Sequence, residues 1–360
     1  MHRRHIHYWK CDREDAFHTP DASSAARRIQ PVLQSLLAKR FDCVEPRLNP
    51  RTAQGIHLTW TAHLHDTPVF IRVEHGQGIH SQLGVESALL DRLPSLGVPV
   101  PTVIASDDSH QDVPFGWQIL EHIPFPDLNH WHKCGQLDQE AIPFQIGRNI
   151  ALWQSMDLQG FGILEFAPGE NLIGGHTSYA SYFNLNLERH LDFLVSSGFI
   201  DTPLCKRILD AVACASHLLD LTQGVLVHKD LALWNILGSS SEVAAFIDFE
   251  DAVSGDPSED LALLACFHRG SFVDQAINGY QSIKRLPTDF TQRFWLHLIR
   301  NMLVKAVIRV GGGYFNRNDS FFLINPGDTG SDLECFTRSR ISSALNGLEK
   351  NLEINDLNFP

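Results

Sequence analysis

The sequence predicts an α+β protein in which a small, strand-rich N-terminal part precedes a larger, mainly helical part. Three observations support this class. Runs rich in β-branched and aromatic residues lie between turn signals at 50–73 and 117–120, a pattern typical of strands. Apolar residues recur at helical spacing through most of the chain after residue 138. Two short apolar runs around the Gly238–Glu242 turn predict a β-hairpin within the helical part.

The composition is that of a globular protein. The chain has 360 residues, 43 % hydrophobic and 20 % charged, which is enough to bury a substantial core. Its net charge of −13 disfavours a nucleic-acid partner. The N-terminus lacks the apolar core of a signal peptide, and no apolar run is long enough for a membrane span. The cysteines form no C-x-x-C pair, which predicts reduced thiols and a cytoplasmic protein.

The first part of the chain is expected to contain two helices and an antiparallel sheet. Residues 1–24 are polar and predicted to be irregular. Helical spacing of apolar residues predicts amphipathic helices over Ala25–Lys39 and Ser81–Leu93. The predicted strands of this part cover 58–64, 69–72 and 117–120.

Helices dominate the prediction for the second part. They are expected over Tyr182–Ser197, Pro203–Leu221, Asp289–Val310 and 331–350. Gly198 is predicted to follow the end of the first of these, and Thr202 to cap the start of the second. Residues 165–180 are predicted to be a loop. Gly311–Gly313 follows a helix instead of opening one, which indicates a helix end and not a phosphate-binding loop.

Three polar side chains are expected at one end of the hairpin. Asn235 opens its first strand and Asp248 ends its second, so antiparallel pairing brings them together. Asp230 precedes Asn235 by a short loop. Two carboxylates and an amide oxygen are hard ligands that suit Mg²⁺ together with phosphate oxygens. This set fits phosphoryl transfer, in which one carboxylate orients the attacking hydroxyl and the other groups hold the metal.

The same segment carries a family resemblance. The pattern His228-x-Asp230-x-x-x-x-Asn235 resembles the catalytic loop of kinases, and Asp248 resembles their metal-binding aspartate. The following segment, Gly255–Asp260 with the sequence GDPSED, narrows the resemblance to one branch of the kinase fold. It is similar to the aminoglycoside phosphotransferase and choline kinase-like branch of the kinase fold, and not to the protein kinases.

The resemblance implies a two-lobed protein-kinase-like fold. A small antiparallel-sheet N-lobe is expected over residues 25–123 and a larger, mainly helical C-lobe over 124–360, with the catalytic hairpin at 225–250. The implied activity is transfer of the γ-phosphoryl group of ATP or GTP, with Mg²⁺, to a hydroxyl of a small molecule. Aminoglycosides, amino alcohols and sugars are the acceptor classes that this resemblance suggests.

The resemblance also implies roles for individual residues. Asp230 would orient and deprotonate the acceptor hydroxyl, while Asn235 and Asp248 would hold Mg²⁺. Arg72 stands where the branch usually has its phosphate-gripping lysine, and Glu86 would pair with it. The structural alternatives are an exposed strand residue for Arg72 and an exposed helical residue for Glu86.

The link between the lobes is expected to follow the strand at 117–120. Glu121 and Ile123 resemble positions at which backbone groups bind the edge of the adenine. Pro124 and Pro126 mark the exit into the larger lobe.

Several residues differ from those that the branch usually has at the same positions. The phosphate-covering turn Thr52–His57 contains one glycine, and Phe70 shares a face with Arg72. Lys229 occupies a usual glycine position, and Ala232 a usual histidine position. These departures motivate a second hypothesis, a nucleotide-binding pseudokinase that acts by association.

Other polar residues near the motif are predicted to be structural. Asp256 and Glu259 have the spacing of a helix N-cap and its third residue. Asp260 is expected to buttress the catalytic loop, and His228 to form structural hydrogen bonds.

The acceptor is left open between a polycation and a neutral alcohol or sugar. A polycation would need carboxylates at the rim of the site. Glu250 and Asp251 are the acidic residues nearest the hairpin, and the alternative for Asp251 is a solvated loop residue.

Overall fold

The structure is a computed structural model that describes residues 22–43, 46–51, 57–74, 82–169, 171–319 and 321–357. The described chain divides into two compact units. The smaller unit contains residues 22–124 and 245–250, and the larger unit contains 125–244 and 251–357.

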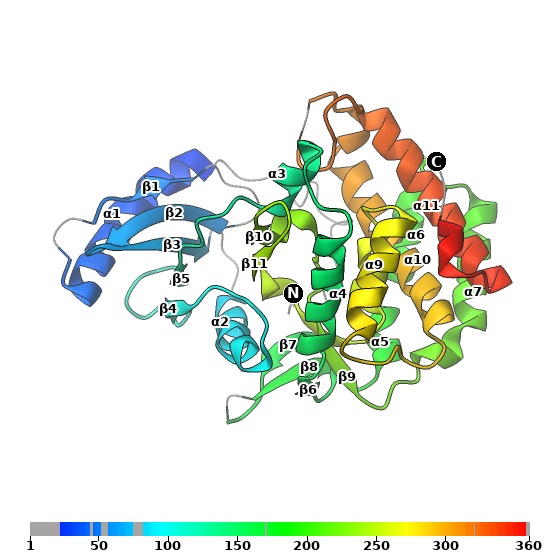
Figure 1. Ribbon diagram of the computed structural model, residues 1–360, viewed down its shortest axis with the longest axis horizontal. Coiled ribbons are helices and arrows are strands. Elements are labelled where there is room, and N and C mark those ends of the chain that lie inside the picture. The colour runs from blue at the N-terminus through cyan, green and yellow to red at the C-terminus, as the bar shows by residue number, and fades with distance from the viewer. Residues whose placement is uncertain are drawn as a thin grey trace. The chain divides into compact units, whose positions relative to one another are not determined.

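A five-stranded antiparallel sheet forms the frame of the smaller unit (Figure 1). Its strands lie in the order β1-β2-β3-β5-β4. Their bounds are β1 Asn49–Pro50, β2 His57–Leu64, β3 Thr67–Glu74, β4 Val103–Asp107 and β5 Trp117–Glu121. All three strands predicted for this part of the chain are present, with slightly wider bounds.

One face of this sheet packs on the leading helix. Helix α1 spans Ala22–Phe41, so residues 22–24 are helical and not irregular as predicted, while residues 1–21 lie outside the described chain. Strand β3 alternates as a half-buried strand should: Val69, Ile71 and Val73 are fully buried in one cluster with α1. Phe70 and Arg72 consequently lie on the other face.

Helix α2 (Leu83–Arg92) and the 3₁₀ turn η3 (Leu93–Leu96) follow β3. The predicted helix is therefore present, although its first predicted residue, Ser81, lies outside the described chain. Gln118 of β5 donates from Nε2 to Ser87 Oγ of α2 at 2.9 Å, and both residues are buried. This bond ties α2 to the sheet. Residues 52–56 of the predicted phosphate-covering turn are not described.

Helices make up most of the larger unit, and α4 and α9 lie side by side in it (Figure 1). The α-helices are α3 Leu128–Lys133, α4 Ala141–Trp153, α5 Tyr179–Phe183, α6 Leu187–Ser196, α7 Thr202–Cys214, α8 Glu259–Leu264, α9 Gly270–Gln281, α10 Phe290–Gly311 and α11 Gly330–Lys350. The 3₁₀ turns are η4 Ser216–Leu219, η5 Leu233–Asn235, η6 Phe249–Asp251, η7 Tyr314–Asn316 and η8 Ile354–Leu357, of which η6 begins in the smaller unit.

Two helix predictions need correction. The helix predicted over Tyr182–Ser197 is interrupted, because Asn186 adopts a left-handed φ of 58° between α5 and α6. The helix predicted over Pro203–Leu221 ends at Cys214 and is followed by η4. Asp201, and not Thr202, caps its start, since the Asp201 side chain accepts from Leu204 N–H at 2.8 Å. The predicted ends at Gly198 and Gly311–Gly313 are confirmed as helix ends.

The larger unit also contains a five-stranded sheet in the order β6-β9-β12-β7-β8. The bounds are β6 Asp157–Leu158, β7 Phe161–Phe166, β8 Leu172–His176, β9 Gly224–Val227 and β12 Val253–Gly255. The prediction of a loop over 165–180 is therefore wrong, because β8 lies within it. The predicted hairpin is present as the two-stranded sheet of β10 (Ile236–Gly238) and β11 (Val243–Phe246).

None of the helices in the described residues is long and apolar enough to cross a membrane.

Candidate active site

The loop after β9 is held by the buried carboxylate of Asp260. The backbone N–H groups of His228 and Lys229 donate to its two oxygens at 2.9 and 3.1 Å. The indole N–H of Trp153 donates to the same carboxylate at 3.2 Å. The prediction that Asp260 buttresses this loop is therefore confirmed. His228 also has the expected structural role, since its Nδ1 accepts from the N–H of Asp230 at 3.3 Å.

The chain changes direction at Lys229, where the loop begins. Its φ of 71° lies in the left-handed region, which explains why glycine suits this position in the family that the sequence resembles. The lysine side chain adds an anchor that glycine lacks. Its ammonium forms a buried ion pair with Glu259 and donates to Asn301 Oδ1 at 3.2 Å. The loop is thus fixed to both α8 and α10.

The start of α8 differs in detail from the predicted cap. The helix begins at Glu259 after Ser258, so Asp256 is not its N-cap residue. Asp256 nevertheless accepts from Ser258 N–H at 2.8 Å and donates its own N–H to Glu259 at 3.0 Å. Its carboxylate also binds Arg293 of α10 and lies 3.3 Å from His297. Burial favours the neutral acid, but His297 and Arg293 outweigh it and hold the pKa of Asp256 at about 2.

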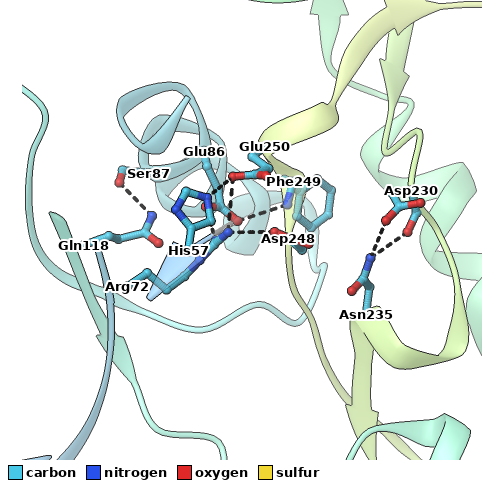
Figure 2. Close-up of polar contacts among 10 residues, drawn as sticks. All are labelled: His57, Arg72, Glu86, Ser87, Gln118, Asp230, Asn235, Asp248, Phe249 and Glu250. Atoms are coloured by element: carbon cyan, nitrogen blue, oxygen red, sulfur yellow. Dashed lines mark hydrogen bonds and ion pairs between the residues drawn. The ribbon is translucent and has the colours of Figure 1, made fainter. Parts of the chain in front are cut away.

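Asp230 is held at both carboxylate oxygens. Oδ1 accepts from the ammonium of Lys305 on α10 at 2.8 Å. Oδ2 accepts from the amide of Asn235 at 3.1 Å, a contact that Figure 2 shows. Burial favours the protonated acid, but the charge and hydrogen bond of Lys305 outweigh it and lower the pKa of Asp230 below its ordinary value. The side chain is therefore an oriented carboxylate at neutral pH, able to accept a proton from a nearby hydroxyl.

Asn235 is oriented by the same loop. Its Nδ2 donates to the backbone oxygen of Asp230 at 2.8 Å as well as to the carboxylate. Because both amide protons are directed to Asp230, Oδ1 is the atom of this side chain suited to ligate a cation.

In the smaller unit, the Arg72 side chain contacts three carboxylates (Figure 2). Its guanidinium forms an ion pair with Glu86 of α2 and contacts Asp248 at 2.7 Å and Glu250 at 3.3 Å. Glu86 is fully buried and also accepts from the N–H of Phe249 at 3.0 Å. The predicted pair of Arg72 and Glu86 is present, and the alternatives that placed either residue on the exposed surface are wrong.

Negative charge exceeds positive charge in this cluster. Burial raises the pKa of Glu86 to about 7, because the single guanidinium that lowers it is shared with Asp248 and Glu250, whose charges raise it. Burial lowers the pKa of Arg72, but the three carboxylates outweigh that effect and raise it above its ordinary range. His57 of β2 also contacts Glu250.

The two predicted adenine-binding positions lie at the end of β5. Glu121 is its last residue, and the Glu121 side chain accepts from the N–H and hydroxyl of Thr102 at 3.2 and 2.9 Å. That side chain therefore fixes the strand end, consistent with a role that depends on backbone groups. Ile123 lies two residues further on, outside any helix or strand, and is half-buried. Adenine binding by these residues stays a prediction.

The donor chemistry fits a hard divalent cation bound with external ligands. Asn235 offers an amide oxygen, and Asp248 belongs to a cluster with excess negative charge. Within the described ranges, no group of three or more His, Cys, Asp or Glu side chains could hold a metal ion. A Mg²⁺ ion would therefore need further oxygen ligands, such as nucleotide phosphates.

The sequence reasoning missed Lys305 and His57. Lys305 had a detectable signal, because it is one charged residue among Met302–Val307 of a strongly apolar helix, and a buried ammonium needs a partner. His57 had none, since its contact with Glu250 joins residues that are distant in sequence.

A small antiparallel-sheet unit, a mainly helical larger unit and an aspartate presented on a buttressed loop define the protein-kinase-like fold. The chain belongs to the phosphotransferase enzyme family, whose sequence model matches residues 53–290. It is accordingly a small-molecule kinase. Among curated proteins, none matches the chain.

Solved structures share the fold. Aminoglycoside phosphotransferase APH(4)-Ia is 14 % identical with a TM-score of 0.63, over 88 % of this chain and 98 % of that one. A thermostable mutant of it, solved as a ternary complex with AMP-PNP and hygromycin B, is 15 % identical with a TM-score of 0.60, over 87 % and 98 %. A microcompartment-associated aminopropanol kinase is 18 % identical with a TM-score of 0.59, over 89 % and 98 %. A putative fructosamine-3-kinase from Haemophilus somnus 129PT is 16 % identical with a TM-score of 0.54, over 86 % and 96 %.

Proposed function

We propose that the protein transfers the γ-phosphoryl group of ATP to a hydroxyl of a small molecule. The observation that carries this proposal is the state of Asp230, an ionised and oriented carboxylate on a buttressed loop. In the reaction, the acceptor oxygen forms a bond to the γ-phosphorus while the bond from that phosphorus to the β-bridging oxygen breaks. Asp230 takes the hydroxyl proton, and ADP leaves.

The remaining residues are assigned to the nucleotide. Arg72, positioned by Glu86, contacts the phosphates, and backbone groups of Glu121 and Ile123 bind the adenine edge. Asn235 and Asp248 hold Mg²⁺, which would neutralise phosphate charge when bound. The smaller unit then corresponds to the N-lobe expected over residues 25–123, and the larger unit to the C-lobe over 124–360. GTP is the alternative nucleotide.

The acceptor class is proposed to be an amine-bearing alcohol. The similar structures carry names that refer to an aminoglycoside, an aminopropanol and a fructosamine, each of which contains an amine. The net charge of −13 also favours a cationic acceptor. Glu250 is excluded as the recognising carboxylate, because it is 8 % exposed and already contacts His57 and Arg72. Asp251 remains the acidic candidate next to the hairpin.

The direct test is ADP release from MgATP with a panel of aminoglycosides, amino alcohols and sugars. Turnover is expected with at least one acceptor. The Asp230→Asn variant should lower kcat by about 10²- to 10⁴-fold, the usual contribution of a general base, with KM for MgATP unchanged.

Asp210→Asn is the matched control. Asp210 also pairs with a lysine, Lys206 at 2.7 Å, but that pair lies on the surface of α7. Its loss should leave kcat unchanged. Undiminished turnover in Asp230→Asn would refute the role of Asp230. No ADP release with any acceptor of the panel would count against the proposed acceptor class.

A further inference from the structure

Two buried arginines on neighbouring helices of the larger unit lack a counter-charge. Arg309 of α10 and Arg340 of α11 are 2 % and 4 % exposed. Within the described ranges neither forms an ion pair with an aspartate or glutamate, whereas Arg72 and Arg293 do. Burial lowers the pKa of Arg309 to about 10, which still leaves it charged at neutral pH. A buried charge without a partner is costly, so negative charge is needed here.

Both guanidinium groups bind the short segment that follows α8. Arg309 Nη2 donates to the carbonyl oxygen of Cys266 at 3.4 Å, and Arg340 Nη2 donates to that of His268 at 3.1 Å. Arg309 Nη1 donates to Thr337 Oγ1 at 2.8 Å. These acceptors are neutral, so they satisfy donors without cancelling the charges. Because the two carbonyl groups are only two residues apart, the two positive charges are neighbours.

Donors of both arginines remain unused. Arg309 Nε and Arg340 Nη1 are buried and have no hydrogen-bond partner in the described part of the chain. The same holds for His268 Nε2. Burial, together with nearby His132 and Arg340, lowers the pKa of His268 to about 3, so this ring adds no charge at neutral pH. Buried donors without an acceptor are uncommon in folded proteins, and an ion is one of the partners that satisfies them.

Arg300 shows how the same helix satisfies a buried arginine without such a gap. It is 1 % exposed. Its Nε and Nη2 donate to the carbonyl oxygens of Phe183 and Leu185 at 2.9 and 2.7 Å, and its Nη1 lies 3.0 Å from His190 Nδ1. All three nitrogens therefore have partners. The unused donors of the other two arginines are a local feature and not a general property of buried arginines in this protein.

We propose that a small monovalent inorganic anion, such as chloride, binds between the guanidinium groups of Arg309 and Arg340. The anion accepts from Arg309 Nε and Arg340 Nη1 and supplies the missing negative charge. A monovalent ion suits this position better than a phosphate dianion, because the Born cost of removing an ion from water rises steeply with its charge. The carbonyl groups of residues 266 and 268 complement the remaining positive charge. This site is independent of the proposed kinase activity.

The test compares the urea midpoint of unfolding in sodium gluconate and in sodium chloride, at equal sodium concentration and neutral pH. Gluconate carries its carboxylate on a bulky polyol, which a buried site excludes. A ligand that binds only the folded state stabilises it by mass action. The wild-type midpoint should therefore rise as chloride replaces gluconate. Crystals grown in sodium bromide should show an anomalous peak between Arg309 and Arg340.

Two variants make the test specific to this site. Arg309→Met and Arg340→Met each remove one of the two charges and keep an apolar side chain. The rise in midpoint with chloride should be lost in both. Each substitution should consequently cost less stability in gluconate than in chloride. Circular dichroism verifies that the variants are folded, and Arg340→Met decides the matter if Arg309→Met does not fold.

Arg300→Met is the matched control, because it removes a buried arginine of the same helix whose nitrogens already have partners. Its midpoint should be lower than that of wild type but should keep the full rise with chloride. The surface variant Arg207→Met should keep it as well. A wild-type midpoint that is equal in the two salts would overturn the proposal. So would a rise of the same size in wild type and in the folded variants of Arg309 and Arg340.

Discussion

The planar guanidinium of Arg72 is the common partner of three carboxylates. The guanidinium fork presents several donors in one plane, so it contacts Glu86, Asp248 and Glu250 at the same time. A lysine ammonium is a compact point charge and matches this arrangement less well. Phosphates that bind to Arg72 would compete with the two carboxylates of the 245–250 segment, while Glu86 keeps the side chain in place.

Loss of this guanidinium should destabilise the fold. Arg72→Met leaves the fully buried carboxylate of Glu86 without its cation, and breaking a buried pair in this way typically costs about 3–5 kcal/mol. We expect a lower urea midpoint at pH 8. Burial already raises the pKa of Glu86 to about 7, and without Arg72 it rises further. The destabilisation should therefore shrink as the pH falls and Glu86 becomes protonated.

A double variant and a surface control make this prediction specific. Arg72→Met combined with Glu86→Leu removes both buried charges and should recover part of the lost stability. Arg207→Met removes an arginine from a surface pair with Glu349, so its urea midpoint should be close to that of wild type. A midpoint of Arg72→Met that equals that of Arg207→Met at pH 8 would contradict the buried pair.

The sequence correctly predicted the orientation of those side chains whose position follows from the periodicity of their own helix or strand. Helical spacing placed Glu86 on the inner edge of α2, and strand alternation placed Arg72 on the face opposite the core. Lys305 and His57 could not be assigned partners in this way, because their contacts join α10 to the catalytic loop and β2 to residue 250. Such contacts depend on tertiary packing, and the spacing of residues within one segment gives no information about it.

At the scale of elements, the glycines of α4 and α9 set how closely these helices pack. A Cβ at Gly147 would lie 1.7 Å from the carbonyl oxygen of Ala276, and one at Gly279 would lie 1.9 Å from that of Phe144. Backbone therefore meets backbone at both positions. Neither contact is visible in the sequence, where both glycines look like weak points in a helix.

Gly147→Ala should consequently destabilise the protein despite the better helix propensity of alanine. The obstacle is a backbone carbonyl, so the helices must move apart, and overpacking of this kind typically costs about 1–3 kcal/mol. The measurement is the free energy of unfolding in urea.

Gly84→Ala is the control within α2. Its Cβ would meet only the end of the exposed Asp108 side chain, which can rotate away. Alanine there should be neutral or stabilise by up to about 1 kcal/mol through helix propensity. Equal destabilisation by the two substitutions would show that close helix packing is not the cause.

Two of the elements that the sequence missed, β6 and β12, are made by distant pairing. Both have three residues or fewer, and their neighbours in the sheet come from other parts of the chain. Hairpin β10–β11 was predicted because its Gly/Ser turn and both strands lie within one short segment. The break at Asn186 was missed because apolar spacing continues across it, although asparagine tolerates the left-handed conformation found there.

At the scale of the whole molecule, the proposed nucleotide ligands belong to both units of the chain. Arg72 and Asp248 lie in the smaller unit, and Asn235 lies in the larger unit. Composition and charge predicted a globular acidic protein but could not supply the acceptor, because the shape of its site depends on loops without a recognisable motif.

Nucleotide binding should stabilise the protein in a way that depends on Mg²⁺. A ligand that binds only the folded state adds RT ln(1 + [L]/Kd), or about 2.7 kcal/mol at one hundred times its Kd. With Asp248 and Asn235 as metal ligands, ATP with Mg²⁺ should raise Tm by more than ATP with EDTA. In Asp248→Asn the extra increase due to Mg²⁺ should be largely lost. The smaller increase with ATP alone should remain, because the proposed contact of Arg72 with the phosphates does not need Asp248. Asp210→Asn, a surface carboxylate outside the cluster, should keep the full response to Mg²⁺. An ATP-induced rise that ignores Mg²⁺ and persists unchanged in Asp248→Asn would instead favour a nucleotide-binding module that works by association.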